Sequence, residues 1–219
     1  MLKLKFSASM MCADYGHLED EIRALEAAGV DAFHVDIMDG AFVHNFGMGL
    51  HDLRYIRSAT KKSVECHLMI HEPVRYVKLF AKAGADVLYF HPESGFQIGE
   101  TVHRIIDLGM TPGIVLNPTT SIESTVELLH LVKRVLIMAV IPGNAGQAFL
   151  PFIEKKLRNL IELKDEFDLE IFWDGHGSVE NVRKYAPLGV DGFVLGTAAL
   201  FGKERGYPEI IRELRGCTA

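Results

Sequence analysis

Residues 34–40 read His-Val-Asp-Ile-Met-Asp-Gly and place an imidazole, a carboxylate and a thioether at alternate positions. The segment follows a helix-like run that ends at Gly29, and it leaves through Asp-Gly, which is typical of a buried strand entering a loop. Alternate side chains share a face, so we expect His34, Asp36 and Met38 to point together. Buried polar side chains cost free energy unless they have partners, and a bound metal ion would be such a partner. The segment therefore predicts half of a metal site, with a hydrogen-bonded His–Asp pair as the alternative.

Two other predicted strands supply the remaining ligand types. The strand Ser63–Met69 carries His67 and Met69 two residues apart, and Asp174 follows the strand that ends at Trp173. Two imidazoles and two carboxylates on one ion suit Zn²⁺, Fe²⁺, Mn²⁺ or Co²⁺ and leave room for substrate oxygens. We therefore expect one divalent ion on His34, Asp36, His67 and Asp174, and the spacing does not choose among the metals.

Glycine-rich turns follow the last three predicted strands, with the sequences Pro-Gly-Asn-Ala-Gly, Asp-Gly-His-Gly-Ser and Leu-Gly-Thr. Backbone amides in such turns, with a helix N-terminus behind them, bind phosphate without lysine or arginine. The predicted phosphate-binding residues are Gly143, Asn144, Ala145, Gly146, Gly175, His176, Gly177, Gly196 and Thr197.

The elements that position these residues alternate along the chain. Apolar runs predict strands at Leu2–Ser9, Val30–Ile37, Ser63–Met69, Ala85–Phe90, Pro112–Leu116, Val135–Val140, Leu169–Trp173 and Val190–Leu195. Helical spacing predicts helices at Tyr15–Ala28, His51–Ser58, Pro73–Ala83 and Ile98–Leu108, from Ser121 onward, at Pro151–Phe167 and Ser178–Pro187, and after the last strand with a break near Gly206.

Strict alternation of short apolar strands with helices is typical of a parallel sheet. The joints Ala-Gly-Val-Asp, Ala-Gly-Ala-Asp and Leu-Gly-Val-Asp recur before three of the strands. Eight such units predict one (β/α)8 TIM barrel over residues 1–219, in which function lies at the carboxyl ends of the strands. A doubly wound open sheet is the alternative, but it needs a glycine-rich turn after the first strand, where the chain has Ser9-Met10-Met11.

The composition limits the classes of partner. A net charge of −6, a pI near 5.9 and the absence of a basic run argue against nucleic acid and anionic membranes. We find no signal peptide and no apolar run that spans a bilayer. Cys12, Cys66 and Cys217 predict reduced thiols in a cytoplasmic protein, with Cys66 serving only in packing.

Around the predicted metal ligands and glycine-rich turns, the chain resembles the ribulose-phosphate 3-epimerase family, including its allulose-6-phosphate 3-epimerase branch. The resemblance covers nearly the whole chain and is carried by five segments. They are HVDIMDGAFVHN at 34–45, ECHLMI at 65–70, IMAVIPGNAGQAF at 137–149, WDG at 173–175 and LGTAALF at 195–201.

The resemblance implies a role for each matching residue. His34, Asp36, His67 and Asp174 become metal ligands, and the two aspartates double as the acid/base pair. Ser9 and His67 contact the substrate, while Met38, Met69 and Met138 line the floor of the site. The implied partner is a small ketose phosphate, and the implied assembly is a homo-oligomer.

Five residues, at four places in the chain, depart from the family pattern. His44 replaces a usual proline, and Phe172 replaces a frequent glutamate, which removes an inward acid behind the site. His176 interrupts a common Asp-Gly-Gly turn, and Asn144-Ala145 replace a common Phe-Gly. These departures concern substrate identity and the phosphate turns, and none of them removes a proposed ligand.

The implied reaction inverts C3 of a ketose phosphate. We favour D-ribulose 5-phosphate to D-xylulose 5-phosphate, followed by D-allulose 6-phosphate to D-fructose 6-phosphate. A cation at the C2 and C3 oxygens would stabilise a cis-enediolate, and one carboxylate on each face would move the proton. The alternatives are a non-catalytic sugar-phosphate-binding relative and another phosphate-binding barrel lyase. A Schiff-base aldolase needs an inward lysine, which the second to eighth predicted strands lack.

Overall fold

Eight parallel strands close into a barrel in the computed structural model, which describes residues 4–217. Each strand pairs with the next in chain order, and β8 pairs with β1 to complete the ring. The strands are β1 Lys5–Ser9, β2 Ala32–Met38, β3 Ser63–Met69, β4 Val87–Phe90, β5 Thr111–Leu116, β6 Arg134–Met138, β7 Glu170–Asp174 and β8 Gly192–Leu195. The predicted (β/α)8 barrel is confirmed, and the open sheet is wrong.

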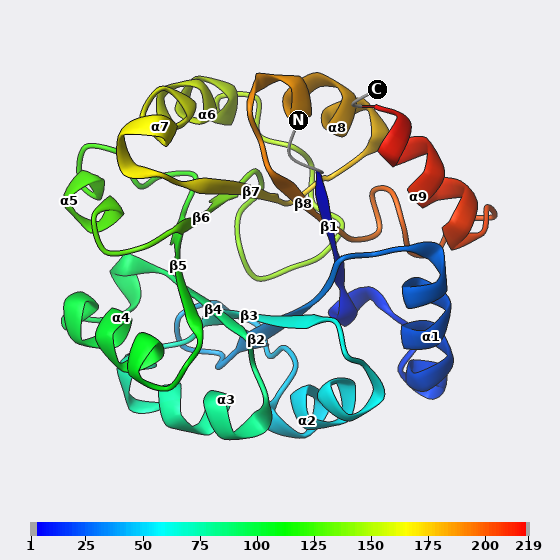
Figure 1. Ribbon diagram of the computed structural model, residues 1–219, viewed down its shortest axis with the longest axis horizontal. Coiled ribbons are helices and arrows are strands. Elements are labelled where there is room, and N and C mark those ends of the chain that lie inside the picture. Colours follow the sequence, from blue (N-terminus) through cyan, green and yellow to red (C-terminus); the bar gives the residue numbers. More distant parts are fainter. Residues whose placement is uncertain (1–3, 218–219) are drawn as a thin grey trace.

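Helices form a ring outside the strands (Figure 1). The α-helices of the described chain are α1 Leu18–Ala28, α2 Leu50–Ala59, α3 Val77–Ala83, α4 Ile98–Asp107, α5 Val126–Leu129, α6 Ile153–Glu162, α7 Lys164–Phe167, α8 Val179–Tyr185 and α9 Tyr207–Gly216. Single turns of 3₁₀ helix are η1 Met10–Cys12, η2 Tyr15–His17, η3 Pro73–Arg75, η4 Pro92–Ser94 and η5 Ala186–Leu188.

Two of the predicted strands begin too early for one shared reason. Val30 and Ala85 are buried, but each closes the preceding helix by donating its N–H to a carbonyl five residues back, at Leu25 and Phe80. This closure follows a left-handed glycine, which at the first of these joints is Gly29 with φ +94°. The first apolar residue after the glycine therefore belongs to the helix cap, and pairing starts two residues later.

Several predicted helices also have different bounds. The helix expected from Ser121 is regular only over α5, since the preceding residues form hydrogen-bonded turns. The helix expected over Pro151–Phe167 is divided at Leu163, whose N–H bonds to the Leu160 carbonyl three residues back. Gly206 precedes α9 and does not interrupt it. Of the first predicted strand, residues 2 and 3 lie outside the described residues.

Side-chain parity divides the core into two layers. Ile171 and Trp173 of β7 point to the helices, where Trp173 stacks on Tyr185 of α8 with ring centroids 4.6 Å apart. Phe172 points into the barrel and packs with a separate interior cluster that includes Tyr89. Glycine makes room for this ring, because a Cβ at Gly192 would lie 2.6 Å from Phe172 Cε1. The interior is thus filled by side chains, as expected of this barrel.

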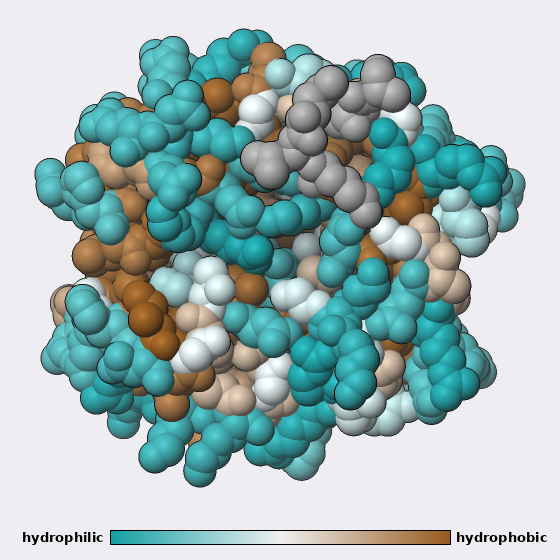
Figure 2. Space-filling view, viewed as in Figure 1, coloured by the Kyte–Doolittle hydropathy of each residue, from teal (hydrophilic) through white to brown (hydrophobic). Residues whose placement is uncertain are grey.

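Figure 2 shows one end of the barrel covered mainly by hydrophilic residues, with hydrophobic surface gathered over α4 and α5. Exposed apolar side chains of this region include Ile106 and Leu108 at the end of α4 and Leu131 after α5. None of the helices that the structure describes is both long and apolar enough to cross a membrane.

Candidate active site

Strand register brings the predicted ligands to one end of the barrel. Asp36 of β2 pairs with His67 of β3, and Ser9 of β1 pairs with His34. On the other side, Asp174 ends β7 opposite Met138 of β6. One potential ligand atom from each of His34, Asp36, His67 and Asp174 lies within 4.8 Å of all the others. The structure therefore assembles the four residues that the sequence singled out.

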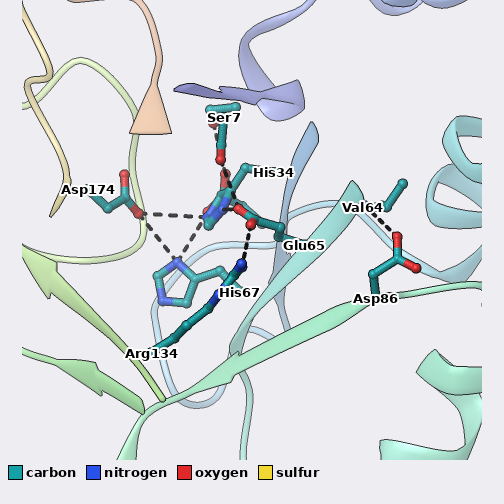
Figure 3. Close-up of polar contacts among 10 residues, drawn as sticks. Ser7, His34, Val64, Glu65, His67, Asp86, Arg134 and Asp174 are labelled. Carbon is teal, nitrogen blue, oxygen red and sulfur yellow. Dashed lines mark hydrogen bonds and ion pairs between the residues drawn. The ribbon is translucent and has the colours of Figure 1, made fainter. Parts of the chain in front are cut away.

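Both carboxylates face both imidazoles. His34 Nε2 lies 3.5 Å from Asp36 Oδ1 and 3.9 Å from Asp174 Oδ2. His67 Nδ1 lies 3.3 Å from Asp36 Oδ1 and 3.5 Å from Asp174 Oδ2. Figure 3 shows Asp174 approaching the two rings from the side opposite Glu65.

The donor set fits a divalent cation. Donors about 2.0–2.1 Å from a tetrahedral zinc ion lie about 3.3–3.4 Å apart, close to the shorter separations in this cluster. Within the described chain, both ring nitrogens of His34 and Nδ1 of His67 are buried without a hydrogen-bond partner. Buried polar atoms of this kind are costly unless a ligand satisfies them. A cation among the four residues would supply that partner for His34 Nε2 and His67 Nδ1, the two nitrogens that face the carboxylates.

The two carboxylates differ in surroundings. Asp36 Oδ2 accepts a hydrogen bond of 2.9 Å from Ser9 Oγ, which leaves Oδ1 facing the imidazoles. The side chain of Asp36 is 6% exposed, whereas that of Asp174 is 16% exposed. Asp174 is therefore the acid with the easier access to water.

The charges of the cluster shift the pKa values of its members. Burial opposes a charge on His34, but Asp36, Glu65 and Asp174 outweigh it and raise the pKa of His34 to about 10. Burial likewise acts against the Asp36 carboxylate, yet His34 and His67 hold its pKa below the usual range. The raised pKa of His34 and the lowered pKa of Asp36 both favour an imidazolium that faces a carboxylate.

Two buried residues that the sequence analysis did not assign to the site stand behind the imidazoles. Glu65 Oε2 lies 3.9 Å from His34 Nδ1, and His91 Nε2 lies 2.9 Å from His67 Nε2. Burial, together with the charge of His67, lowers the pKa of His91 well below its usual value, so His91 is neutral and has a ring nitrogen that can accept a hydrogen bond from His67. Glu65 has the strand parity of His67 and Met69, and that parity was the signal that could have revealed it.

A cavity of about 240 Å³ opens above the cluster. Of the predicted residues, Ser9, Asp36, His67, Asp174 and the three methionines line it, and so do all the residues of the phosphate turns except Gly177. His34 lies behind the wall and is fully buried. Cys12 lines the cavity as well, which the sequence analysis missed.

Similarity to known proteins shows the family to which the chain belongs. A model of the ribulose-phosphate 3-epimerase family matches residues 5–201. The ribulose-phosphate 3-epimerase of Methanocaldococcus jannaschii is 38% identical over 92% of this chain and 86% of its own length. That of Synechocystis sp. is 38% identical over 94% of this chain and 91% of its own. The chain belongs to the ribulose-phosphate 3-epimerase family. It is therefore an isomerase of the epimerase type.

A solved structure outside the epimerase family shares the barrel. The 3-keto-L-gulonate-6-phosphate decarboxylase of Vibrio cholerae aligns with a TM-score of 0.71 over 99% of this chain and 97% of that one. Its sequence identity is 13%, so the likeness concerns the fold alone.

The departures from the epimerase pattern have structural counterparts. His44 is exposed and lines a neighbouring cavity, formed with Pro118 and Pro142, and not the active-site cavity. Phe172 occupies the barrel interior and carries no acid, while a different buried acid, Glu65 of β3, stands behind the site. The family motif at β3 thus carries an acid that the sequence analysis overlooked.

The glycine-rich turns that were predicted to bind phosphate all reach the cavity of this epimerase. His176 has φ +49°, a left-handed conformation that costs a non-glycine residue about 1–2 kcal/mol. Asn181 Nδ2 donates to the His176 carbonyl, and the His176 ring lies 3.2 Å from the Gln147 carbonyl. The expected helix N-terminus follows only the second turn, where α8 begins. Residues 197–201 continue as turns after Gly196.

Proposed function

We propose that this epimerase inverts C3 of D-ribulose 5-phosphate by moving a proton between Asp36 and Asp174. The observation that carries the proposal is the convergence of these carboxylates, from β2 and β7, on one point at the cavity floor. The family relatives named above supply the substrate class. A carboxylate on each side of a bound sugar is what inversion at carbon requires.

The residues of the chain perform the proton transfer. Asp36 takes the C3 proton from one face while Asp174 delivers a proton to the other, and the roles exchange in the reverse direction. Ser9 fixes the Asp36 carboxylate through its hydrogen bond to Oδ2 and orients the second oxygen toward the site. A divalent ion held by His34, Asp36, His67 and Asp174 would offset the negative charge that develops on the C2 oxygen. Zn²⁺, Fe²⁺, Mn²⁺ and Co²⁺ all suit this donor set.

The methionines keep the floor free of competing acids. Met38 and Met69 pack together with Val43, and Met138 packs with the interior cluster, so their thioethers line the cavity without an exchangeable proton. A polarisable and aprotic surface beneath the enediolate would not protonate it. We propose that, because of this floor, the two aspartates are the groups that donate a proton to the intermediate.

The phosphate of the substrate would occupy the glycine-rich end of the cavity. The turn at Gly143–Gly146 after β6, Gly175-His176 after β7 and Gly196-Thr197 after β8 all contribute to its wall. Gly177 would act only by close packing, because a Cβ there would lie 2.9 Å from the Val194 carbonyl. Backbone amides in such turns bind a dianion.

The test uses the metal-loaded enzyme in D₂O with D-ribulose 5-phosphate and, separately, D-allulose 6-phosphate. We expect D-xylulose 5-phosphate that carries deuterium at C3, with a higher kcat/KM for the pentulose. Preferred turnover of the hexulose would assign the enzyme to the allulose branch. Absence of both turnover and C3 exchange, with bound metal demonstrated, would overturn the proposal in favour of a binding protein.

A further inference from the structure

His34 lies between acids on both sides. Its Nε2 faces Asp36 and Asp174, and its Nδ1 faces Glu65 Oε2 at 3.9 Å. The ring is fully buried, so no bulk water reaches either nitrogen. A neutral imidazole carries one N–H and one lone pair, and only the lone pair binds a cation. Whatever places the proton on Nδ1 therefore makes Nε2 available to the cation.

Glu65 is firmly held. Ser7 Oγ donates to Glu65 Oε2 at 2.9 Å, and Arg134 Nη1 donates to Oε1 at 2.9 Å (Figure 3). The residue is 3% exposed, which leaves little freedom for the carboxylate to turn away. An ionised carboxylate accepts hydrogen bonds only, so the neighbouring His34 nitrogen is stabilised as N–H.

Arg134 belongs to a longer chain of charges at the end of the barrel where the strands begin, and the side chains of Lys5 and Glu170 there are 40% exposed. Its Nε donates to Glu170 Oε2 at 2.9 Å, and Lys5 Nζ contacts Glu170 Oε1 at 2.5 Å. The guanidinium lies 5.0 Å from the centre of the Phe172 ring. Phe172 therefore fills the position of the missing family acid and at the same time supports the arginine that orients Glu65 on β3.

The second imidazole is oriented differently. His67 presents Nδ1 to the acids, and its Nε2 pairs with neutral His91 at 2.9 Å. A carboxylate behind a ligand imidazole raises its basicity more than a neutral acceptor does. The two ligands of this site are thus unequal, and His34 has the stronger support.

We infer that Glu65, held by Arg134 and Ser7, is a positioning residue that keeps the proton of His34 on Nδ1 and so directs the Nε2 lone pair to the cation. This inference rests on the metal site of the proposed function. It adds to that site a carboxylate that touches neither the substrate nor the cation.

The test measures Co²⁺ binding to the metal-free protein by titration of the visible absorption. Glu65→Gln should weaken Co²⁺ binding about 10–100-fold, the usual cost of losing such a partner. The amide introduced by this substitution would turn its oxygen to Arg134 and its NH₂ to His34 Nδ1, which favours the wrong tautomer. Glu65→Asp retains the carboxylate and should recover part of the affinity.

Glu170→Gln is the matched control. It removes a carboxylate from the same arginine without touching His34. Its Co²⁺ affinity should therefore stay within about threefold of the wild-type value, and the shape of its absorption spectrum should not change. The spectrum is a readout that a general loss of stability would not move. In Glu65→Gln we expect altered d–d bands, and faster exchange of the paramagnetically shifted His34 N–H signal in D₂O.

Wild-type Co²⁺ affinity and spectrum in Glu65→Gln would overturn the inference, and so would an equal loss in Glu170→Gln. The outcome is separable from the proposed function. Glu65-dependent Co²⁺ binding without turnover of either ketose phosphate would sink the epimerase proposal and leave the positioning role standing.

Discussion

At the scale of single residues, the two proposed proton carriers are unequal. Asp36 is nearly buried and bonded to Ser9, while Asp174 is the more exposed carboxylate. A proton on Asp174 therefore exchanges with water more readily than a proton on Asp36. This difference should appear as unequal retention of isotope in the two directions of the reaction.

Replacing either aspartate tests the two-base mechanism. Asp36→Asn and Asp174→Asn each remove one base and should lower epimerisation about 10²–10⁴-fold, because general acid–base catalysis contributes that much. Each variant should still exchange the C3 proton of one epimer, the one whose hydrogen faces the surviving base. NMR of the two epimers in D₂O measures this exchange. Asp168→Asn, at an exposed carboxylate bonded to Lys133, is the control.

The two-base mechanism would be wrong if Asp174→Asn bound metal normally and epimerised at close to the wild-type rate. In that case His91 or a water molecule would become the candidate second acid. His91 is buried behind His67 and does not line the cavity, so the structure favours Asp174.

The pH dependence of metal binding follows from His34. Because its pKa is raised to about 10, the His34 ring carries a proton on both nitrogens at pH 7 in the metal-free protein, including the Nε2 that would bind the cation. A cation must displace that proton, so Co²⁺ affinity should rise with pH up to about 10 and fall as the pH is lowered. Calorimetry in buffers of different ionisation enthalpy would count the protons released. Binding at pH 7 without proton release would contradict the prediction.

At the scale of elements, the strand ends carry the site and the glycine turns shape it. Gly175 opens the glycine-rich turn after β7 with φ +96°, and a Cβ there would lie 2.6 Å from Val140 Cγ2. A side chain at this position would meet both backbone strain and a clash. The turn therefore depends on glycine for its shape as well as for its amides.

Gly175→Ala should raise KM for the phosphate ester. It should also lower the free energy of unfolding, and the loss should exceed the value of about 1–2 kcal/mol expected from the left-handed backbone alone. Gly29→Ala is the matched control, since Gly29 has φ +94° and an added Cβ would meet nothing within 4 Å. The control should lose stability but keep its KM. Equal KM values in both variants would show that the β7 turn does not bind phosphate. Denaturation and steady-state kinetics provide the measurements.

The cluster at the candidate site could be predicted from sequence because its residues obey strand parity. His34, Asp36 and His67 lie at alternate positions of apolar runs, and these runs form the paired strands β2 and β3 in the structure. Glu65 obeys the same parity but was overlooked, since its partner Arg134 is 69 residues away and no local pattern connects them. Pairings of this length depend on how the barrel closes, which the spacing of residues along the chain does not encode.

At the scale of the whole molecule, the order of elements was predictable and their bounds were less so. β3 has the predicted bounds, Ser63–Met69, because its alternation is complete. The predicted strand from Val30 began early because a helix cap and a buried strand both require an apolar residue after the glycine. Such competition between local motifs is resolved only when the helix packs against the barrel.

Metal binding should stabilise the entire barrel, because the four ligands come from β2, β3 and β7 on different sides of it. Unfolding must separate these strands and release the ion. Co²⁺ at about 100 times its Kd would add about 2.7 kcal/mol, which for a chain of this size raises Tm by about 5–11 °C. Addition of a chelator should reverse the shift.

Two variants separate ligation from general stability in this measurement. Asp174→Ala should abolish the Co²⁺-induced rise in Tm, because it removes the ligand from β7. Asp86→Asn should lower the starting Tm, since Asp86 Oδ2 accepts bonds from Arg57 and from the Val64 N–H, yet keep the full Co²⁺-induced rise. A rise that persists in Asp174→Ala would mean that the ion is bound without β7. The cation would then tie only β2 to β3, and Asp174 would be left as a proton carrier alone.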